Sequence, residues 1–148
     1  VHDTDFIVGM LGAPDAVLCL GEPRHHRTMY RYESGPRLVT AEGGWLPSTH
    51  YPFQMRYRVR FEEAIADFEL GREPELLLYG PGTVDAVDLA PGKGYEWQVQ
   101  ALVAAIRDGT SEPVTLRDAA DVMRVIAAEQ TSLATGTWTP SGIRSAAR

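Results

Sequence analysis

Cysteine is nearly absent from this sequence, which contains one, Cys19, among 148 residues. An internal disulfide is therefore excluded, and a thiol inside the apolar run Ala16–Leu20 is expected to be a small core residue. No apolar run approaches the length needed to span a bilayer, and no signal-peptide pattern is visible. These absences favour a reducing, cytoplasmic setting.

An excess of basic residues is also absent. The chain has 14 Lys and Arg against 20 Asp and Glu, a net charge of −6. Nucleic acids and anionic membranes bind basic surfaces, so neither is expected as a partner. A hydrophobic content of 44% and a charged content of 23% are typical of a globular chain, and the length predicts one domain with its own core.

Alternating apolar residues dominate the first half of the chain. In Phe53–Phe61 the odd-numbered residues are apolar, while Gln54 and three arginines occupy the other face. Strands that follow one another through short turns pair mostly antiparallel. The expected strands are Ala16–Leu20, Arg27–Glu33, Arg37–Glu42, Phe53–Phe61, Ala66–Leu70, Glu75–Tyr79 and Thr83–Leu89.

Helical signals occur at both ends of the chain. A short helix is expected at the N-terminus, ended by Gly12. A second covers 95–106 and is ended by Gly109, and a third begins at a Thr115–Asp118 capping box and stops before Gly136. The apolar stripe predicted for the third helix is Leu116, Ala119, Ala120, Met123, Ile126, Ala127, Gln130 and Leu133.

This order predicts an α+β domain over residues 1–140. Its open, mostly antiparallel or mixed β-sheet would comprise roughly five to seven strands, with both C-terminal helices packed on one face. Residues 141–148 lack a periodic apolar face and are expected to form a loose tail.

The first candidate site is the sequence start, where His2, Asp3 and Asp5 share one helical turn. Histidine exchanges protons near neutral pH and suits acid–base chemistry on an alcohol or carbonyl. Asp3 or Asp5 would orient the ring or bind a hydroxyl. The alternative is that both aspartates stabilise the helix N-terminus and His2 is merely an end residue. On the first interpretation, the chain begins inside an active-site segment of a longer enzyme.

A second candidate follows the Gly43-Gly44 pair. Trp45, His50 and Tyr51 would form an aromatic wall with polar tips for a polyol or sugar. The alternative is an ordinary strand-end loop with a partly buried tryptophan.

Other motifs carry weaker signals. Gly80-Pro81-Gly82 and Gly92-Lys93-Gly94 lack a complete phosphate-binding fingerprint and are expected to be turns, so this chain should bind no nicotinamide cofactor itself. His25-His26 is expected in a surface turn rather than a metal site. The Arg56, Arg58 and Arg60 face would pair with acidic neighbours or serve assembly.

These motifs together resemble one family. The segment His2–Pro14 is similar to the His-x-x-Asp segment and following apolar run of the Gfo/Idh/MocA oxidoreductases. Glu42-Gly43-Gly44-Trp45 with Phe53–Phe61 resembles the central sheet of their C-terminal domain. The helices near the end resemble that domain's closing helix pair. One departure is Glu62-Glu63-Ala64, where the family usually has a glycine-rich turn.

The resemblance implies a two-domain enzyme. An N-terminal Rossmann domain would bind NAD or NADP and supply a lysine, while this domain would supply the substrate pocket, a catalytic histidine and an open sheet for homo-oligomerisation. His2 matches that histidine and Asp5 a supporting aspartate. The implied substrates are sugars, inositols and related polyols, and the separated domain would be inactive. The remaining alternative is a non-catalytic ligand-binding or dimerisation module of the same fold.

Overall fold

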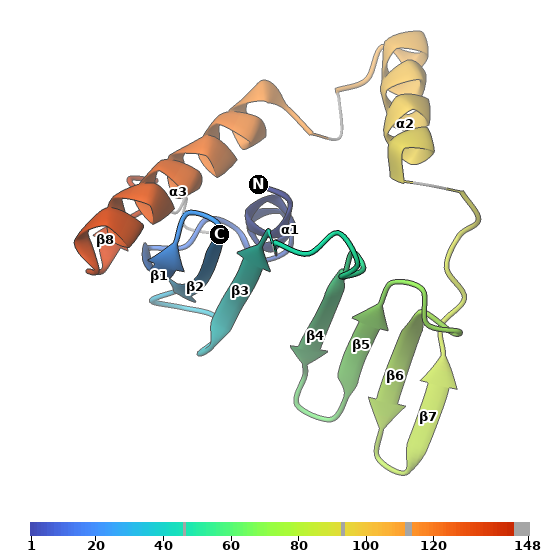
Figure 1. Ribbon diagram of the computed structural model, residues 1–148. Coiled ribbons are helices and arrows are strands. Elements are labelled where there is room, and N and C mark those ends of the chain that lie inside the picture. The colour runs from blue at the N-terminus through green and yellow to red at the C-terminus, as the bar shows by residue number, and fades with distance from the viewer. Residues whose placement is uncertain (46, 93, 112–113, 144–148) are drawn as a thin grey trace. The chain divides into compact units, whose positions relative to one another are not determined.

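The computed structural model describes residues 1–45, 47–92, 94–111 and 114–143 (Figure 1). The chain forms two compact units. The first unit combines Val1–Pro47 with Leu102–Arg148, and the second is Ser48–Ala101. Both sheets are antiparallel, so the predicted α+β class with mostly antiparallel pairing is confirmed.

The first unit contains a four-stranded sheet in the order β3-β2-β1-β8. Its strands are β1 (Ala16–Glu22), β2 (His25–Arg31), β3 (Val39–Gly44) and β8 (Thr139–Pro140). The hairpin of β1 and β2 pairs Ala16 with Arg31 and Glu22 with His25. The short strand β8 was not predicted from the sequence, and it adds the C-terminal segment to the edge of β1.

Two helices cover one face of this sheet: α1 (His2–Leu11) and α3 (Leu116–Thr135). Their common core consists of Ile7, Val17, Tyr30, Val125 and Ala128, contributed by both helices, β1 and β2. Burying an aliphatic side chain of this kind stabilises a fold by about 1.5–3 kcal/mol. This core fixes α1, and with it His2, against the sheet.

The ends of α3 are those that the sequence predicted. Thr115 Oγ accepts a hydrogen bond from the Asp118 backbone N–H at 3.2 Å, and the Asp118 carboxylate accepts one from the Thr115 N–H at 2.8 Å. This reciprocal capping box satisfies backbone donors that a helix start leaves free. At the other end Gly136 adopts φ 67°, a left-handed conformation that favours glycine.

The face by which α3 packs differs from the predicted one. Leu116 and Met123 of the expected stripe are 89% and 58% exposed. The buried residues of α3 are Val122, Val125, Ala128, Glu129 and Ser132. Two polar residues occupy this stripe, so a search for apolar periodicity selects a neighbouring one. The predicted stripe is therefore wrong, although the helix itself is confirmed.

The second unit is built on a separate four-stranded antiparallel sheet, ordered β4-β5-β6-β7, where a single sheet was expected. Its strands are β4 (Arg56–Arg60), β5 (Ile65–Glu69), β6 (Leu76–Gly80) and β7 (Thr83–Ala86). Tyr57 stacks on Phe68 of the neighbouring strand, with ring centroids 5.0 Å apart. Gly80-Pro81-Gly82 makes the hairpin turn between β6 and β7, with Gly82 at φ 79°.

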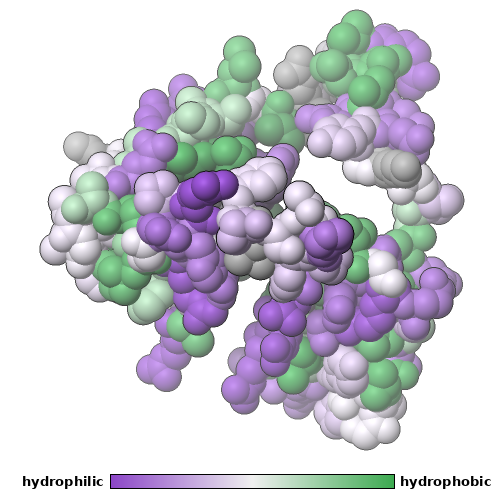
Figure 2. Space-filling view, viewed as in Figure 1, coloured by the Kyte–Doolittle hydropathy of each residue, from purple (hydrophilic) through white to green (hydrophobic). Residues whose placement is uncertain are grey.

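Helix α2 (Gly94–Asp108) crosses from the second unit into the first. Several large apolar side chains along it are exposed, among them Tyr95 at 78% and Ile106 at 71%. Figure 2 shows the resulting hydrophobic surface on this helix, at the upper right. Packing against a sheet, which was predicted for both C-terminal helices, is thus observed for α3.

The segment after Pro140 begins in the core. Ser141 is 4% exposed and its N–H donates to the carbonyl oxygen of Asp15 at 3.1 Å, while Ile143 packs on the core cluster. The remainder of the expected loose tail, 144–148, lies outside the described residues. Within the described part of the chain, no helix combines the length and hydrophobicity that crossing a membrane requires.

Candidate functional site

The first turn of α1 carries three side chains of the first candidate site. His2, Asp3 and Asp5 are all exposed. The carbonyl of Val1 accepts the hydrogen bond from the Asp5 N–H at 2.8 Å, so His2 stands at the first position of a regular helix. The imidazole is therefore open to solvent on a backbone of defined geometry.

The same turn is anchored through its buried residue, Thr4. The Thr4 hydroxyl donates to Glu129 Oε1 of α3 at 3.2 Å, and the Tyr30 hydroxyl of β2 donates to the same oxygen at 2.7 Å. All three residues are buried. Hydrogen bonds to a buried carboxylate are stronger than hydrogen bonds between neutral groups, and a buried carboxylate without a donor would destabilise the fold. Glu129 thus ties α1 to α3 and β2, two residues from His2.

The phenol of Tyr30 is held in its donor form. Burial raises the pKa of Tyr30, and the negative charge of Glu129 raises it further. A protonated phenol donates to a carboxylate, whereas a phenolate would repel it. The Tyr30 hydroxyl therefore remains a hydrogen-bond donor to Glu129.

Asp3 of the first candidate site lies beside Gly43, at the start of the second candidate site. A Cβ atom at Gly43 would lie 3.5 Å from Asp3 Oδ2, so the Asp3 carboxylate sits directly over the β3 backbone. Gly44 is tighter, because a Cβ there would lie 2.9 Å from Cδ2 of His25. The predicted Gly pair therefore serves close approach, at Gly43 beside the helix turn that carries His2.

The aromatic residues of the second candidate site are distributed over both units. Trp45 extends the β3 edge, its N–H donating to the Arg24 carbonyl at 2.7 Å, and its side chain is 81% exposed. His50 and Tyr51 belong to the second unit and are exposed. The Tyr51 hydroxyl donates to Gln54 Oε1 at 3.1 Å. An aromatic wall formed by all three stays a prediction.

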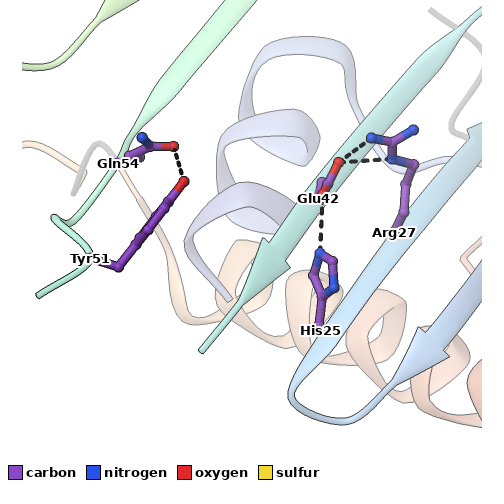
Figure 3. A network of polar contacts seen from close by, with 5 residues as sticks. All are labelled: His25, Arg27, Glu42, Tyr51 and Gln54. Carbon is purple, nitrogen blue, oxygen red and sulfur yellow. Dashed lines mark hydrogen bonds and ion pairs between the residues drawn. The ribbon is translucent and has the colours of Figure 1, made fainter. Parts of the chain in front are cut away.

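The two adjacent histidines begin β2, so their predicted placement in a surface turn is wrong. His25 Nε2 lies 3.1 Å from Glu42 Oε1, and Arg27 donates through Nε to Glu42 Oε2 at 3.0 Å (Figure 3). Arg27, and secondarily His25, lowers the pKa of Glu42. This exposed cluster lies on the sheet face opposite Tyr30, because neighbouring strand residues point to opposite faces.

Sequence reasoning missed Glu129 and Tyr30 as residues that support the site. Glu129 lies in a helix with many charged positions, and only its place four residues after Val125 marks the buried stripe. Within the described ranges no group of three or more His, Cys, Asp or Glu side chains is arranged to hold a metal ion.

Solved structures share this fold. A Desulfitobacterium hafniense protein named as an NADPH-dependent oxidoreductase matches with a TM-score of 0.80 and 15% identity, over 95% of this chain and 46% of its own. Levoglucosan dehydrogenase, solved with NADH and levoglucosan, matches with a TM-score of 0.77 and 17% identity, over 95% and 48%. UDP-N-acetylglucosamine 3-dehydrogenase from Acidithiobacillus ferrooxidans matches with a TM-score of 0.74 and 15% identity, over 91% of this chain and 45% of its own.

These structural neighbours are named as oxidoreductases or dehydrogenases. At such identities the likeness is one of fold, and it confirms the fold that the sequence resemblance implied. The chain spans about half the length of each protein it matches. No family model and no curated protein sequence matches the chain.

Proposed function

We propose that this chain is the substrate-binding and assembly domain of a cytoplasmic NAD(P)-dependent oxidoreductase that acts on a sugar, an inositol or a related polyol. The observation that carries the proposal is the fold match over about 95% of the chain to proteins named as oxidoreductases, of which it spans about half. The domain is inactive when separated from the part of the enzyme that binds the dinucleotide.

The dinucleotide is assigned to another domain because the glycine motif that the structure describes does not form a phosphate-binding turn. Gly80-Pro81-Gly82 closes the hairpin between β6 and β7 and opens no helix, whereas a dinucleotide fingerprint requires a strand–turn–helix unit. Lys93 of the second glycine motif lies outside the described residues. Titrating this chain with NADH should therefore give no saturable change in nicotinamide fluorescence, and sub-millimolar binding would contradict the assignment.

His2 is the proposed catalytic residue. When bound, the nicotinamide exchanges a hydride with the substrate carbon, so an alcohol substrate must also release its hydroxyl proton. An exposed imidazole on the anchored turn of α1 accepts that proton and returns it in the reverse direction. Such general-base assistance is typically worth about 10²–10⁴ in rate.

The remaining predicted residues are proposed to bind the polyol. Asp5 lies one turn along α1 from His2 and supports that turn. Trp45, exposed at the end of β3, offers an apolar ring with a polar N–H for a sugar face. His50 and Tyr51 belong to the second unit and stay predictions as substrate-binding residues.

The test uses the intact enzyme that contains this chain. Levoglucosan, D-glucose and myo-inositol are assayed with NAD and NADP, with L-tartrate as an acidic comparison. The His2→Ala variant should lower kcat by roughly a hundredfold or more on the substrate that is turned over, with the KM for the nicotinamide unchanged. His25→Ala, on the far face of the sheet from α1, is the matched control.

Wild-type kcat across the pH range in His2→Ala would overturn the catalytic assignment. If no polyol is turned over while sugars still bind to the intact protein, the alternative holds instead. The chain would then be a non-catalytic ligand-binding or dimerisation module of the same fold.

A further inference from the structure

The helix-covered face of the first sheet holds a second histidine beside the His2-bearing turn. His26 alternates along β2 with His25 and Arg27, so it shares its face with Thr28 and Tyr30, both buried under the helices. In the ladder His26 stands opposite Gly43. Cross-strand partners point to the same face, with Cβ atoms about 5 Å apart.

Gly43 connects His26 to Asp3. The Cβ position of Gly43, which points to the His26 face, lies 3.5 Å from Asp3 Oδ2. The Asp3 carboxylate therefore lies beside Gly43, the residue of β3 that pairs with His26. Because Gly43 carries no side chain, the space beside the Asp3 carboxylate at this strand position is left open.

The surroundings of the His26 ring select its tautomer. Nδ1 is covered by protein and has no hydrogen-bond partner among the described residues. A buried N–H without an acceptor is rarer and more costly than a buried lone pair without a donor. The proton of the neutral ring is therefore placed on Nε2. Nε2 makes no hydrogen bond among the described residues and, unlike Nδ1, is not a buried unpartnered atom, which leaves it for a ligand.

We propose that His26 and Asp3 form a hydroxyl-binding pair for the substrate of the enzyme, adjacent to the catalytic His2. His26 donates through Nε2–H to an oxygen of the substrate, and Asp3 accepts from a hydroxyl. A hydroxyl group both donates and accepts, so one polyol or two neighbouring hydroxyls satisfy both residues. The Asp3 charge disfavours carboxylate and phosphate groups at this position. This inference rests on the proposed function, and it names two residues that would bind the hydroxyl groups of the substrate.

The kinetic test uses the intact enzyme and the polyol that it oxidises fastest among levoglucosan, D-glucose and myo-inositol. His26→Ala should raise the KM for that polyol roughly tenfold, the scale of one lost hydrogen bond of about 1.4 kcal/mol. His26→Gln, whose amide N–H reaches the Nε2 position, should restore most of the loss. His26→Asn, whose amide ends near Nδ1, should not. The KM for the nicotinamide should stay unchanged throughout.

Two further variants separate binding from folding. Gly43→Ala removes no polar group and places a methyl group 3.5 Å from Asp3 Oδ2, an ordinary contact distance. That methyl group occupies space beside Asp3 in which the substrate hydroxyl is proposed to lie, so the variant should also raise the polyol KM. His25→Ala, one residue away on the opposite face, should not. The proposed role of His26 and Asp3 would be overturned by an unchanged polyol KM in His26→Ala. It would also be overturned if His26→Asn restored the KM as well as His26→Gln does.

Nitrogen NMR of this chain labelled at histidine tests the tautomer without catalysis. The four histidines are assigned by single His→Gln variants. The His26 ring should show its proton on Nε2, and a proton on Nδ1 would refute the inference. Loss of turnover in His2→Ala together with an unaffected His26→Ala refutes the pair alone. An unaffected His2→Ala instead refutes the proposed catalytic function.

Discussion

The hydroxyl of Tyr30 donates a 2.7 Å hydrogen bond to Glu129 Oε1, joining β2 to α3 across 99 residues of sequence. Thr4 of α1 donates to the same carboxylate oxygen. Three elements that are distant in the chain thus converge on one buried side chain. Its third member, Thr4, lies in the turn that carries His2, the proposed catalytic residue.

Removing the phenol hydroxyl should weaken this convergence. In Tyr30→Phe the buried Glu129 loses one of its donors, so we expect the free energy of unfolding to fall by about 1–3 kcal/mol. Tyr95→Phe is the matched control, because Tyr95 is 78% exposed and should change stability little. Urea unfolding followed by circular dichroism measures both. Equal midpoints for the two variants would show that the buried bond contributes nothing.

A second buried contact joins α3 to the sheet. Ser132 Oγ accepts from the Cys19 N–H at 2.9 Å and donates to the Thr137 carbonyl at 2.6 Å, and Ser132 is fully buried. Ser132→Ala leaves both backbone groups unmet, which should cost about 1–3 kcal/mol of unfolding free energy. Thr131→Ala removes an exposed hydroxyl from the same helix turn and should cost much less. Thermal unfolding of the two variants compares them directly.

Much of the secondary structure was readable from the sequence because its signals are local. The capping box at Thr115 and the glycine at Gly136 fix the ends of α3 through neighbouring backbone groups. Alternation located the seven strands from β1 to β7, because a strand buried on one face repeats every two residues. The two residues of β8 are too few for any such pattern.

The buried face of α3 and the support of the site were not readable for a common reason. Glu129 and Ser132 are polar, and their burial depends on Thr4, Tyr30 and Cys19, which lie far away in sequence. The same holds for Gly43, whose neighbour Asp3 is set by the packing of α1 on β3. By contrast, His2 was a candidate from its residue type and its place in a helix turn.

The exposed cluster around Glu42 predicts a dependence on acidic pH. Arg27 and then His25 lower the pKa of Glu42, so the folded state favours the carboxylate. Its contribution is present above the ordinary glutamate pKa of about 4.3 and is lost as the pH falls through the lowered folded value. NMR titration should show that Arg27→Gln raises the pKa of Glu42 more than His25→Gln does. The reverse order would contradict the roles assigned to the two cations.

Assembly is the last prediction, and it concerns the second unit. The ladder places Arg56 and Arg58 opposite Glu69 and Asp67. Both carboxylates, however, lie within ion-pair distance of Arg72, at 3.8 and 3.5 Å. Across the described ranges no ion pair involves the three arginines of β4. Pairing with acidic neighbours, one of the two interpretations of this face, thus receives no support from the contacts.

The same face carries apolar surface. The register aligns Arg60 with Ile65, Tyr79 and Val84, of which Tyr79 is 36% and Val84 61% exposed. Exposed apolar residues beside arginines are typical of interfaces, so we expect this face to pair with a second copy in a homodimer or larger even-numbered oligomer. A charge that replaces an apolar side chain must be desolvated when the two faces pair, so Val84→Asp should weaken assembly, whereas Arg24→Glu, in the turn between β1 and β2, should not. Sedimentation velocity of the intact protein at roughly tens of micromolar measures this, and a wild-type monomer at that concentration would contradict the assembly role.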